Sequence, residues 1–288
     1  MHGIKSFYGN IKMRFVSWNL LSPELLIRFW RDSYGLPLLS DNNQYDQVNY
    51  QRIMNITKVL ENLEADIICL QEISTNNLPG LGMPVHHYIA QRLGFIVAAE
   101  SFKNNPFLYN YPPNENSKHL SIDSGVCILI RPSVQLINTM TAETTGPSTL
   151  FQGTGSPFIT TQVLISNTSI NLSTVHIRIK DGHVYAPIEE YLRKNGGIDF
   201  SFGIIMGDFN SSIDPNDLAR TGLVTLKHPM PITDDDQMFI GDNIRGYSSI
   251  SSELLLHTNA DPGQAAFNWD LIQEGRATSD HPFMIFDM

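Results

Sequence analysis

The sequence predicts an α/β fold in which two mixed sheets form a sandwich and helices cover their outer faces, in the layer order α/β/β/α. Three observations support this. The chain opens on a strand, a loop, a helix and a second strand, an order typical of layered α/β folds. Segments with the pattern of strands clearly outnumber those with the pattern of helices. No repeat, low-complexity tract or linker divides the 288 residues, so we expect one domain over residues 13–288 after a short extension over residues 1–12.

The elements of the first part of the chain follow from apolar runs and their spacing. Residues 14–18 are expected to form the first strand, and residues 20–50, rich in aromatic residues, Asn, Asp and Pro, to be irregular. From residue 50 to residue 63 apolar side chains recur at helical spacing, which predicts a helix. An apolar run over residues 67–70 predicts a buried strand, and residues 85–93 a further helix.

The rest of the chain is expected to be mostly strands joined by long loops. One further helix is expected at residues 186–194, before a strand that leads to the central acidic motif. The expected strands lie at residues 95–99, 125–130, 158–165, 169–176, 202–206 and 283–286.

The charge of the chain limits the classes of partner that it can bind. The formal net charge is −10 and the pI is about 5.3, which argues against a strongly basic nucleic-acid clamp, whose pI usually exceeds ~9. An acidic enzyme can still act on a polyanion when a bound Mg²⁺ supplies positive charge at the reacting phosphate. Nucleic acid therefore stays among the expected substrates.

The cysteines and the apolar runs bear on the compartment. The two cysteines, Cys69 and Cys127, lie in apolar strand-like runs and are expected to be buried free thiols rather than a disulfide framework. No stretch approaches the ~20 apolar residues of a membrane span, and the N-terminus lacks the apolar region of a signal peptide. We expect an intracellular, cytoplasmic protein without stable membrane insertion.

Acidic and amide side chains follow two apolar strand-like runs. Glu72 comes directly after the run at residues 67–70, and Asp208 and Asn210 flank Phe209 after the run that ends at Gly207. A carboxylate at a strand end can bind a hard cation such as Mg²⁺ without being desolvated in the core. Gly207 permits close approach of backbone or substrate. Each residue alone is also compatible with an ordinary polar strand end.

Two histidines occupy comparable positions. His281 follows Asp280 just before the last expected strand, and His176 ends the strand-like run at residues 169–176. An imidazole titrates near working pH and can act as a general base or stabilise a charged transition state, while the adjacent carboxylate can bind the metal. Together with Asn19, which follows the first strand, these residues predict a metal-dependent site that cleaves phosphodiesters.

Four short segments together resemble the endonuclease/exonuclease/phosphatase superfamily, which has the DNase-I-like fold. They occur in the order and at the wide spacing of that family and span almost the whole chain: Trp18-Asn19, Leu70-Gln71-Glu72, Gly207-Asp208-Phe209-Asn210 and Ser279-Asp280-His281.

The resemblance implies a role for each matching position. Glu72 would be the principal metal ligand, with Asn19 and Asp280 also at the metal. Asp208 would orient or deprotonate the attacking water. Asn210 and His176 would contact the phosphate. His281 would be the catalytic histidine.

The resemblance also implies an aspartate that pairs with His281. Asp242 and Asp270 are both candidates. We favour Asp242, because it leaves room for a further strand before Asp280, whereas Asp270 leaves only about a hairpin.

Residues 14–130 resemble the deadenylase and nocturnin-like branch of the superfamily. This implies a Mg²⁺-dependent phosphodiesterase, with Mn²⁺ as a possible substitute, that acts on nucleic acid, in particular as a deadenylase-like 3′ exonuclease on single-stranded RNA. The segment between His176 and Asp208 and the lead-in to Asp280 are shorter than in that branch. The alternatives are a phosphatase or phospholipase-type member that acts on inositol phosphates or sphingomyelin, and a DNA endonuclease.

Overall fold

A computed structural model describes the backbone over thirteen stretches of the chain, although in some strands the side chains are not described. These stretches are residues 13–29, 35–37, 39, 42–104, 123–143, 157–165, 168–176, 203–208, 223–227, 242–247, 259–262, 266–281 and 283–287. The expected extension over residues 1–12 and the expected helix over residues 186–194 lie outside these stretches, so both remain predictions.

The described strands form two six-stranded mixed sheets. The first sheet has the order β11-β12-β1-β2-β4-β3. Its strands are β1 (Arg14–Asn19), β2 (Ile67–Ile73), β3 (Ile96–Asn104), β4 (Asp123–Ile130), β11 (Asn259–Pro262) and β12 (Met284–Asp287).

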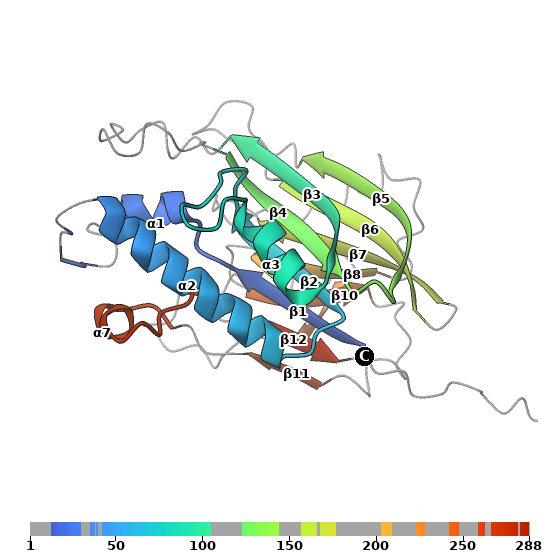
Figure 1. Ribbon diagram of the computed structural model, residues 1–288. Helices are drawn as coiled ribbons and strands as arrows, with labels where there is room; N and C mark the ends of the chain where they lie inside the picture. Colours follow the sequence, from blue (N-terminus) through green and yellow to red (C-terminus); the bar gives the residue numbers. More distant parts are fainter. Residues whose placement is uncertain are drawn as a thin grey trace, which may run out of the picture.

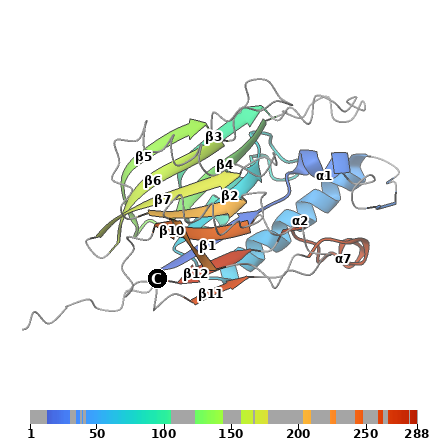
Figure 2. The ribbon, with the colours of Figure 1, turned by 180° about the vertical axis from the view of Figure 1, so that it is seen from behind.

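The second sheet has the order β5-β6-β7-β8-β10-β9, and Figure 2 shows it in front of the first. Its strands are β5 (Gln135–Glu143), β6 (Pro157–Ile165), β7 (Thr168–His176), β8 (Gly203–Asp208), β9 (Leu223–Lys227) and β10 (Asp242–Tyr247). The two sheets contact each other face to face, as the sequence predicts.

Helices cover the outer face of the first sheet (Figure 1). The long helix α2 (Asn42–Asn62) and the helix α3 (Val85–Leu93) lie on this face, while the short helices α1 (Pro23–Phe29) and α7 (Trp269–Gln273) lie together near one end of α2. The expectation of an irregular segment over residues 20–50 is therefore wrong, because α1 and the first turns of α2 lie within it.

Two apolar layers hold these elements together. Between the sheets, Phe15 and Cys69 from the first sheet are buried against Leu172 and Met206 from the second. Between the first sheet and the helices, a second cluster joins side chains of β1, β2 and β4 to those of α2 and α3, such as Ile53. Successive residues of β1 and β2 alternate between the two layers, because neighbouring side chains of a strand point to opposite faces. Burial on both faces explains why β2 is a continuous apolar run in the sequence.

Each sheet contains one parallel pair among its described strands, and this feature positions the site. In the first sheet β1 runs parallel to β2, with Asn19 opposite Gln71. In the second sheet β7 runs parallel to β8, with His176 opposite Asp208. Strands β1 and β2 contact β7 and β8 across the interface between the sheets. Four polar strand ends are thereby brought to one edge of the sandwich.

Both cysteines are buried free thiols, which confirms the expectation from the sequence. Burial raises the pKa of the Cys69 thiol to about 12, an effect that the hydrogen bond with Thr174 partly offsets. Burial likewise raises the pKa of Cys127. Both thiols are therefore neutral at physiological pH and behave as small apolar side chains of the core.

The expected strands and the helix over residues 85–93 are observed close to their predicted bounds. Strand β5 was not expected from the sequence, although it pairs with β6 over most of its length. Among the described helices, none is both long enough and apolar enough to cross a membrane.

Candidate active site

Glu72 reaches the site through an irregularity of β2. The pairing of β2 with β4 shifts between Gln71 and Ile73, and Glu72 has a φ of +55°. A bulge of this kind re-aims a side chain that regular alternation would direct to the opposite face of the sheet. Gln71 faces the second sheet, where its Nε2 donates to Thr174 Oγ1 at 3.0 Å. The bulge lets Glu72 face the same way as Gln71.

The side chain of Asn19 links the two principal carboxylates of the site. Its Nδ2 donates to Glu72 Oε1 at 3.1 Å and to Asp208 Oδ2 at 3.0 Å. The orientation of the amide is set by the backbone N–H of Leu21, which donates to Asn19 Oδ1 at 3.1 Å. Asn19 thus meets the carboxylates as a hydrogen-bond donor through its nitrogen, and its role as a metal ligand stays a prediction.

The second carboxylate oxygen of Glu72 is held by the backbone. The N–H of Ser22 donates to Glu72 Oε2 at 3.1 Å, across the turn between β1 and α1 in which Leu21 has a φ of +53°. A left-handed conformation at a residue other than glycine costs energy and persists only where its surroundings hold it. Here two left-handed residues, Leu21 and Glu72, lie side by side around one carboxylate.

Asp208 approaches the site because Gly207 lets β8 come close to β7. Gly207 has a φ of +146°, and a Cβ at this position would lie 2.0 Å from the carbonyl oxygen of Val175. The close backbone approach that the sequence predicts at Gly207 is therefore observed, to the neighbouring strand. It places the nearly inaccessible Asp208 beside His176 at the shared edge of the two strands.

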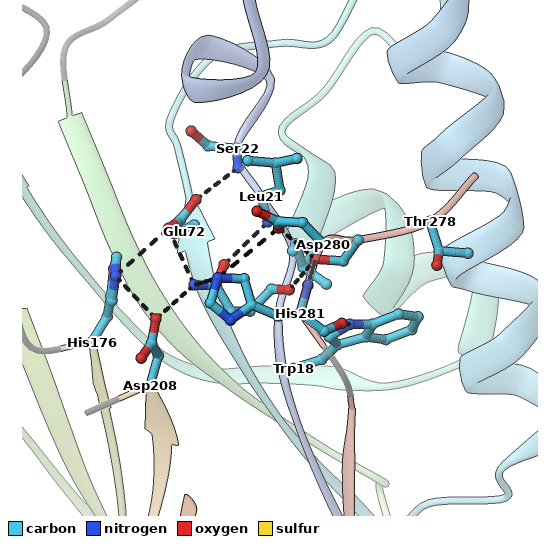
Figure 3. Close-up of polar contacts among 12 residues, drawn as sticks. Trp18, Leu21, Ser22, Glu72, His176, Asp208, Thr278, Asp280 and His281 are labelled. Carbon is cyan, nitrogen blue, oxygen red and sulfur yellow. Dashed lines mark hydrogen bonds and ion pairs between the residues drawn. The ribbon is translucent and has the colours of Figure 1, made fainter. Parts of the chain in front are cut away.

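His176 lies between the two carboxylates (Figure 3). Its Nε2 is 3.6 Å from Glu72 Oε1 and 3.6 Å from Asp208 Oδ2. It belongs to the second sheet and Glu72 to the first, so the cluster spans the interface between the sheets. An imidazole in this position can contact a phosphate oxygen bound at the carboxylates.

A turn before β12 brings Asp280 and His281 to the same cluster. The hydroxyl of Ser279 donates to the carbonyl of Asn19 at 2.6 Å, and the N–H of His281 donates to Ser279 Oγ at 3.2 Å. The indole N–H of Trp18 donates to the carbonyl of His281 at 3.0 Å. These contacts place His281 Nε2 3.4 Å from Asn19 Nδ2 and 3.9 Å from Asp280 Oδ1.

A buried arginine of α2 supports both turns from behind. Arg52 donates to the carbonyls of Leu20 and Leu21 in the turn after β1, and to the carbonyl of Thr278 at 3.2 Å in the turn before β12. It also donates to Asn49 Oδ1 at 3.1 Å. The planar guanidinium can serve several carbonyls at once because its N–H groups form a rigid fork.

The charges of the site fit a divalent cation. Glu72 and Asp208 are both buried, and burying two carboxylates together is costly unless positive charge compensates them. Their hydrogen bonds described above come from the neutral donors Asn19 and Ser22, while Asp280 lies at the partly exposed side. Carboxylate oxygens that converge in this way are the ligands preferred by Mg²⁺.

The remaining predicted residues are only partly placed. Asn210 lies outside the described residues, so its role remains a prediction. The backbone of Asp242 lies opposite Asp208 in the pairing of β10 with β8, which puts Asp242 at the same edge of the sandwich. Asp270 is an exposed residue in the first turn of α7. The pairing of His281 with Asp242 rather than with Asp270 therefore stays a prediction.

No role was predicted from the sequence for three residues that support the site. Ser22, Arg52 and Ser279 act through backbone groups of turns, and their partners lie far away in the sequence. Ser279 was included only as a neighbour of Asp280. The one available signal was a charged residue, Arg52, on the apolar face of an expected helix.

Solved structures of other proteins share this architecture. The catalytic domain of human Nocturnin, with a bound sulfate anion, superimposes with a TM-score of 0.60 at 16% identity, covering 96% of this chain and 92% of that one. ANGEL2, a 2′,3′-cyclic phosphatase in complex with adenosine-2′,3′-vanadate, gives 0.59 at 14% identity and covers 96% of each chain. A protein of the endonuclease/exonuclease/phosphatase family from Leptotrichia buccalis gives 0.59 at 12% identity, covering 95% and 98%. These similarities support the DNase-I-like fold.

Sequence comparison gives the family itself. A search of curated proteins found no significant match. Residues 16–281, which include every segment of the cluster described above, match the Endonuclease/Exonuclease/phosphatase family. Members of this family are metal-dependent hydrolases that act on phosphodiester bonds. The chain therefore belongs to the endonuclease/exonuclease/phosphatase family and is a hydrolase of this metal-dependent class.

Proposed function

We propose that the protein is a Mg²⁺-dependent phosphodiesterase that hydrolyses single-stranded RNA, in the manner of a deadenylase-like 3′ exonuclease. The observation that carries the hydrolytic part of the proposal is the convergence of Asn19, Glu72, His176, Asp208 and His281 from the two sheets (Figure 3). Carboxylates, imidazoles and an amide at one edge of a sandwich can bind a cation and a phosphate together.

Glu72 and Asp280 are the residues that would hold the Mg²⁺. Glu72 Oε2 is fixed by the Ser22 N–H and Oε1 by the Asn19 amide, so its orientation is set before a cation arrives. A bound Mg²⁺ would neutralise charge on the phosphate and the leaving oxygen. Because the nitrogen of Asn19 faces the carboxylates, we assign Asn19 the role of positioning them. Mn²⁺, which also accepts oxygen ligands, is expected to substitute.

The other residues act on water and phosphate. Asp208 would orient the attacking water and accept its proton, since its Oδ2 is fixed by Asn19 at 3.0 Å. His281 would stabilise the charge that develops on the phosphate, with Asp242 as the partner that fixes its imidazole. His176 and Asn210 would contact the non-bridging oxygens.

The RNA part of the proposal rests on the resemblance of residues 14–130 to the deadenylase and nocturnin-like branch. The fold similarity to human Nocturnin and to ANGEL2 agrees with this branch, and the ligand bound to ANGEL2 is an adenosine derivative. A ribonucleotide chain that ends in adenosine is therefore the first substrate to test.

A panel of substrates separates the proposal from its alternatives. We expect the purified protein with Mg²⁺ to shorten 5′-labelled single-stranded poly(A) RNA, and to act more slowly on single-stranded DNA, duplex DNA, phosphoinositides and sphingomyelin. Phosphate release from phosphoinositides, phosphocholine release from sphingomyelin or nicking of duplex DNA, without RNA cleavage, would contradict the RNA assignment. RNA that ends in a 2′,3′-cyclic phosphate belongs in the panel because ANGEL2 is a phosphatase of such ends.

A further inference from the structure

A second group of metal-binding side chains lies away from the catalytic site, where α3 meets the edge strand β3. It consists of His86 and His87 from α3 and Glu100 from β3. His86 Nε2 lies 2.7 Å and His87 Nε2 3.3 Å from the same oxygen, Glu100 Oε2. One potential ligand atom from each residue lies within 4.8 Å of the others.

The strand register separates this group from the catalytic site. Cys127 of β4 pairs with Leu70 of β2 on one side and with Glu100 of β3 on the other. Glu100 is therefore two strands away from β2, or roughly 10 Å at the usual strand spacing. It also faces α3 on the outer side of the first sheet, whereas Glu72 faces the second sheet.

We propose that His86, His87 and Glu100 bind a Zn²⁺ ion that is distinct from the catalytic metal. Tetrahedral zinc has bonds of about 2.0–2.1 Å to imidazole nitrogen and carboxylate oxygen, so its ligand atoms lie about 3.3 Å apart. The separation between His87 and Glu100 already has this value. The separation between His86 and Glu100 has to open by roughly 0.6 Å, a change that rotation of the partly exposed Glu100 side chain can supply.

An ion pair or hydrogen bond between His86 and Glu100 is the competing explanation, and by itself it does not account for the approach of His87 Nε2 to the same oxygen. The two imidazole rings lie 4.4 Å apart between centroids, so two protonated rings would repel each other. A metal ion instead binds both rings in their neutral form, and the two Nε2 atoms already lie near one carboxylate oxygen. The ring of Phe102, 5.6 Å from that of His86, forms an apolar wall beside the buried ligand.

The ligand chemistry selects the metal. Two imidazoles and one carboxylate suit Zn²⁺, whereas Mg²⁺ prefers oxygen ligands alone. The side chains of His87 and Glu100 are 44% and 39% exposed, so water can take the fourth position from solvent. The bound ion would link the first turn of α3 to β3, at the edge of the first sheet.

Zinc binding to the full-length protein tests this proposal. We would titrate Zn²⁺ against a chromophoric chelator in millimolar Mg²⁺, so that Mg²⁺ fills the catalytic site. The expected result is a single zinc site in the parent that weakens by at least about tenfold in His87→Ala and in Glu100→Gln. Gln91→Ala, an exposed change on the same helix, and Glu72→Gln in the catalytic site should both retain the parent affinity.

Three results would overturn the proposal. Equal zinc affinity in the parent and in His87→Ala would show that these residues are not zinc ligands. The absence of any zinc binding tighter than millimolar would show the same. Loss of zinc binding in Glu72→Gln alone would place the ion in the catalytic site instead. Because His87 and Glu100 are partly exposed, both variants should fold, and thermal unfolding of each in EDTA checks this. Mg²⁺-dependent hydrolysis by His87→Ala should equal that of the parent.

Discussion

One amide group joins the two buried carboxylates of the catalytic site. Asn19 Nδ2 has two hydrogens, and its two shortest contacts are with Glu72 at 3.1 Å and Asp208 at 3.0 Å. The carboxylates come from different sheets, so Asn19 fixes their separation. An aspartate at this position would add a third negative charge, whereas asparagine supplies a donor of the same shape.

Replacing Asn19 with alanine should lower the rate of hydrolysis more than the stability of the fold. We expect kcat to fall by about tenfold to a hundredfold, because the carboxylates lose their shared donor and their fixed separation. Asn55→Ala is a suitable control, since the Asn55 amide also joins distant segments, by donating to the carbonyls of Gly275 and Ala277. Steady-state kinetics of both variants make the comparison, and equal loss of kcat in the two would contradict this role of Asn19.

At the scale of residues, the sequence predicts which residues meet but not how they meet. Four residues could be singled out because each is polar and ends or follows an apolar strand-like run: Asn19, Glu72, His176 and Asp208. The bulge at Glu72 depends on pairing with β4, more than fifty residues away, and leaves no local pattern. The orientation of the Asn19 amide depends on the backbone of Leu21, a contact that the sequence of the strand end does not indicate.

At the scale of elements, the close approach of β8 to β7 depends on one glycine. Gly207→Ala would place a methyl group 2.0 Å from the carbonyl oxygen of Val175, and the strands would have to separate beside Asp208. Such overpacking costs about 1–3 kcal/mol. We expect urea unfolding to show this loss, and hydrolysis to slow because Asp208 moves.

Gly82→Ala is the matched control for Gly207→Ala. Gly82 also has a positive φ, of +71°, but no atom lies within 4 Å of a Cβ added there. This variant should lose only the backbone preference of glycine, about 1 kcal/mol, and keep its rate of hydrolysis. A Gly207→Ala protein as active as the Gly82→Ala protein would contradict the role of the glycine in placing Asp208.

Helix α2 supports the site through Arg52, which donates to carbonyls of both catalytic turns. Arg52→Met should leave buried carbonyls without donors and destabilise the protein by at least about 2 kcal/mol. Arg92→Met, an exposed change on α3, should be nearly neutral. Chemical denaturation measures both, and a loss of less than about 0.5 kcal/mol in Arg52→Met, typical of a surface change, would rule out this support.

Elements with long apolar runs or clear periodicity were predictable, and exposed elements were not. Strand β2 is buried along its whole length and stands out in the sequence. Strand β5 lies at the edge of the second sheet with Leu136 and Ile137 largely exposed, so its sequence lacks the alternation of a half-buried strand. Helix α1 spans seven residues, too few for periodicity to distinguish it from a loop.

At the scale of the whole molecule, four residues of the candidate site, Asn19, Glu72, His176 and Asp208, come from the two parallel pairs, β1 with β2 and β7 with β8. A cation held by Glu72 and Asp280, which lie far apart in the sequence, binds the folded state alone, so it should stabilise the whole fold. At a Mg²⁺ concentration ten times its Kd, the expected gain is about 1.4 kcal/mol. Thermal unfolding with Mg²⁺ or with EDTA measures the gain in the parent, and Glu72→Gln should lose most of it. An unchanged melting temperature in the parent would contradict cation binding at this site.

If these strand ends form one metal-dependent hydrolytic site, Glu72 and a bound cation are both required for hydrolysis. The most direct measurement is the Mg²⁺-dependent hydrolysis of bis(p-nitrophenyl) phosphate, which does not depend on the natural substrate, by the parent and by Glu72→Gln. We expect EDTA to abolish the activity of the parent and Glu72→Gln to be slower by at least ~10²-fold. A Glu72→Gln protein that hydrolyses this ester as fast as the parent, in the same Mg²⁺, would contradict this requirement.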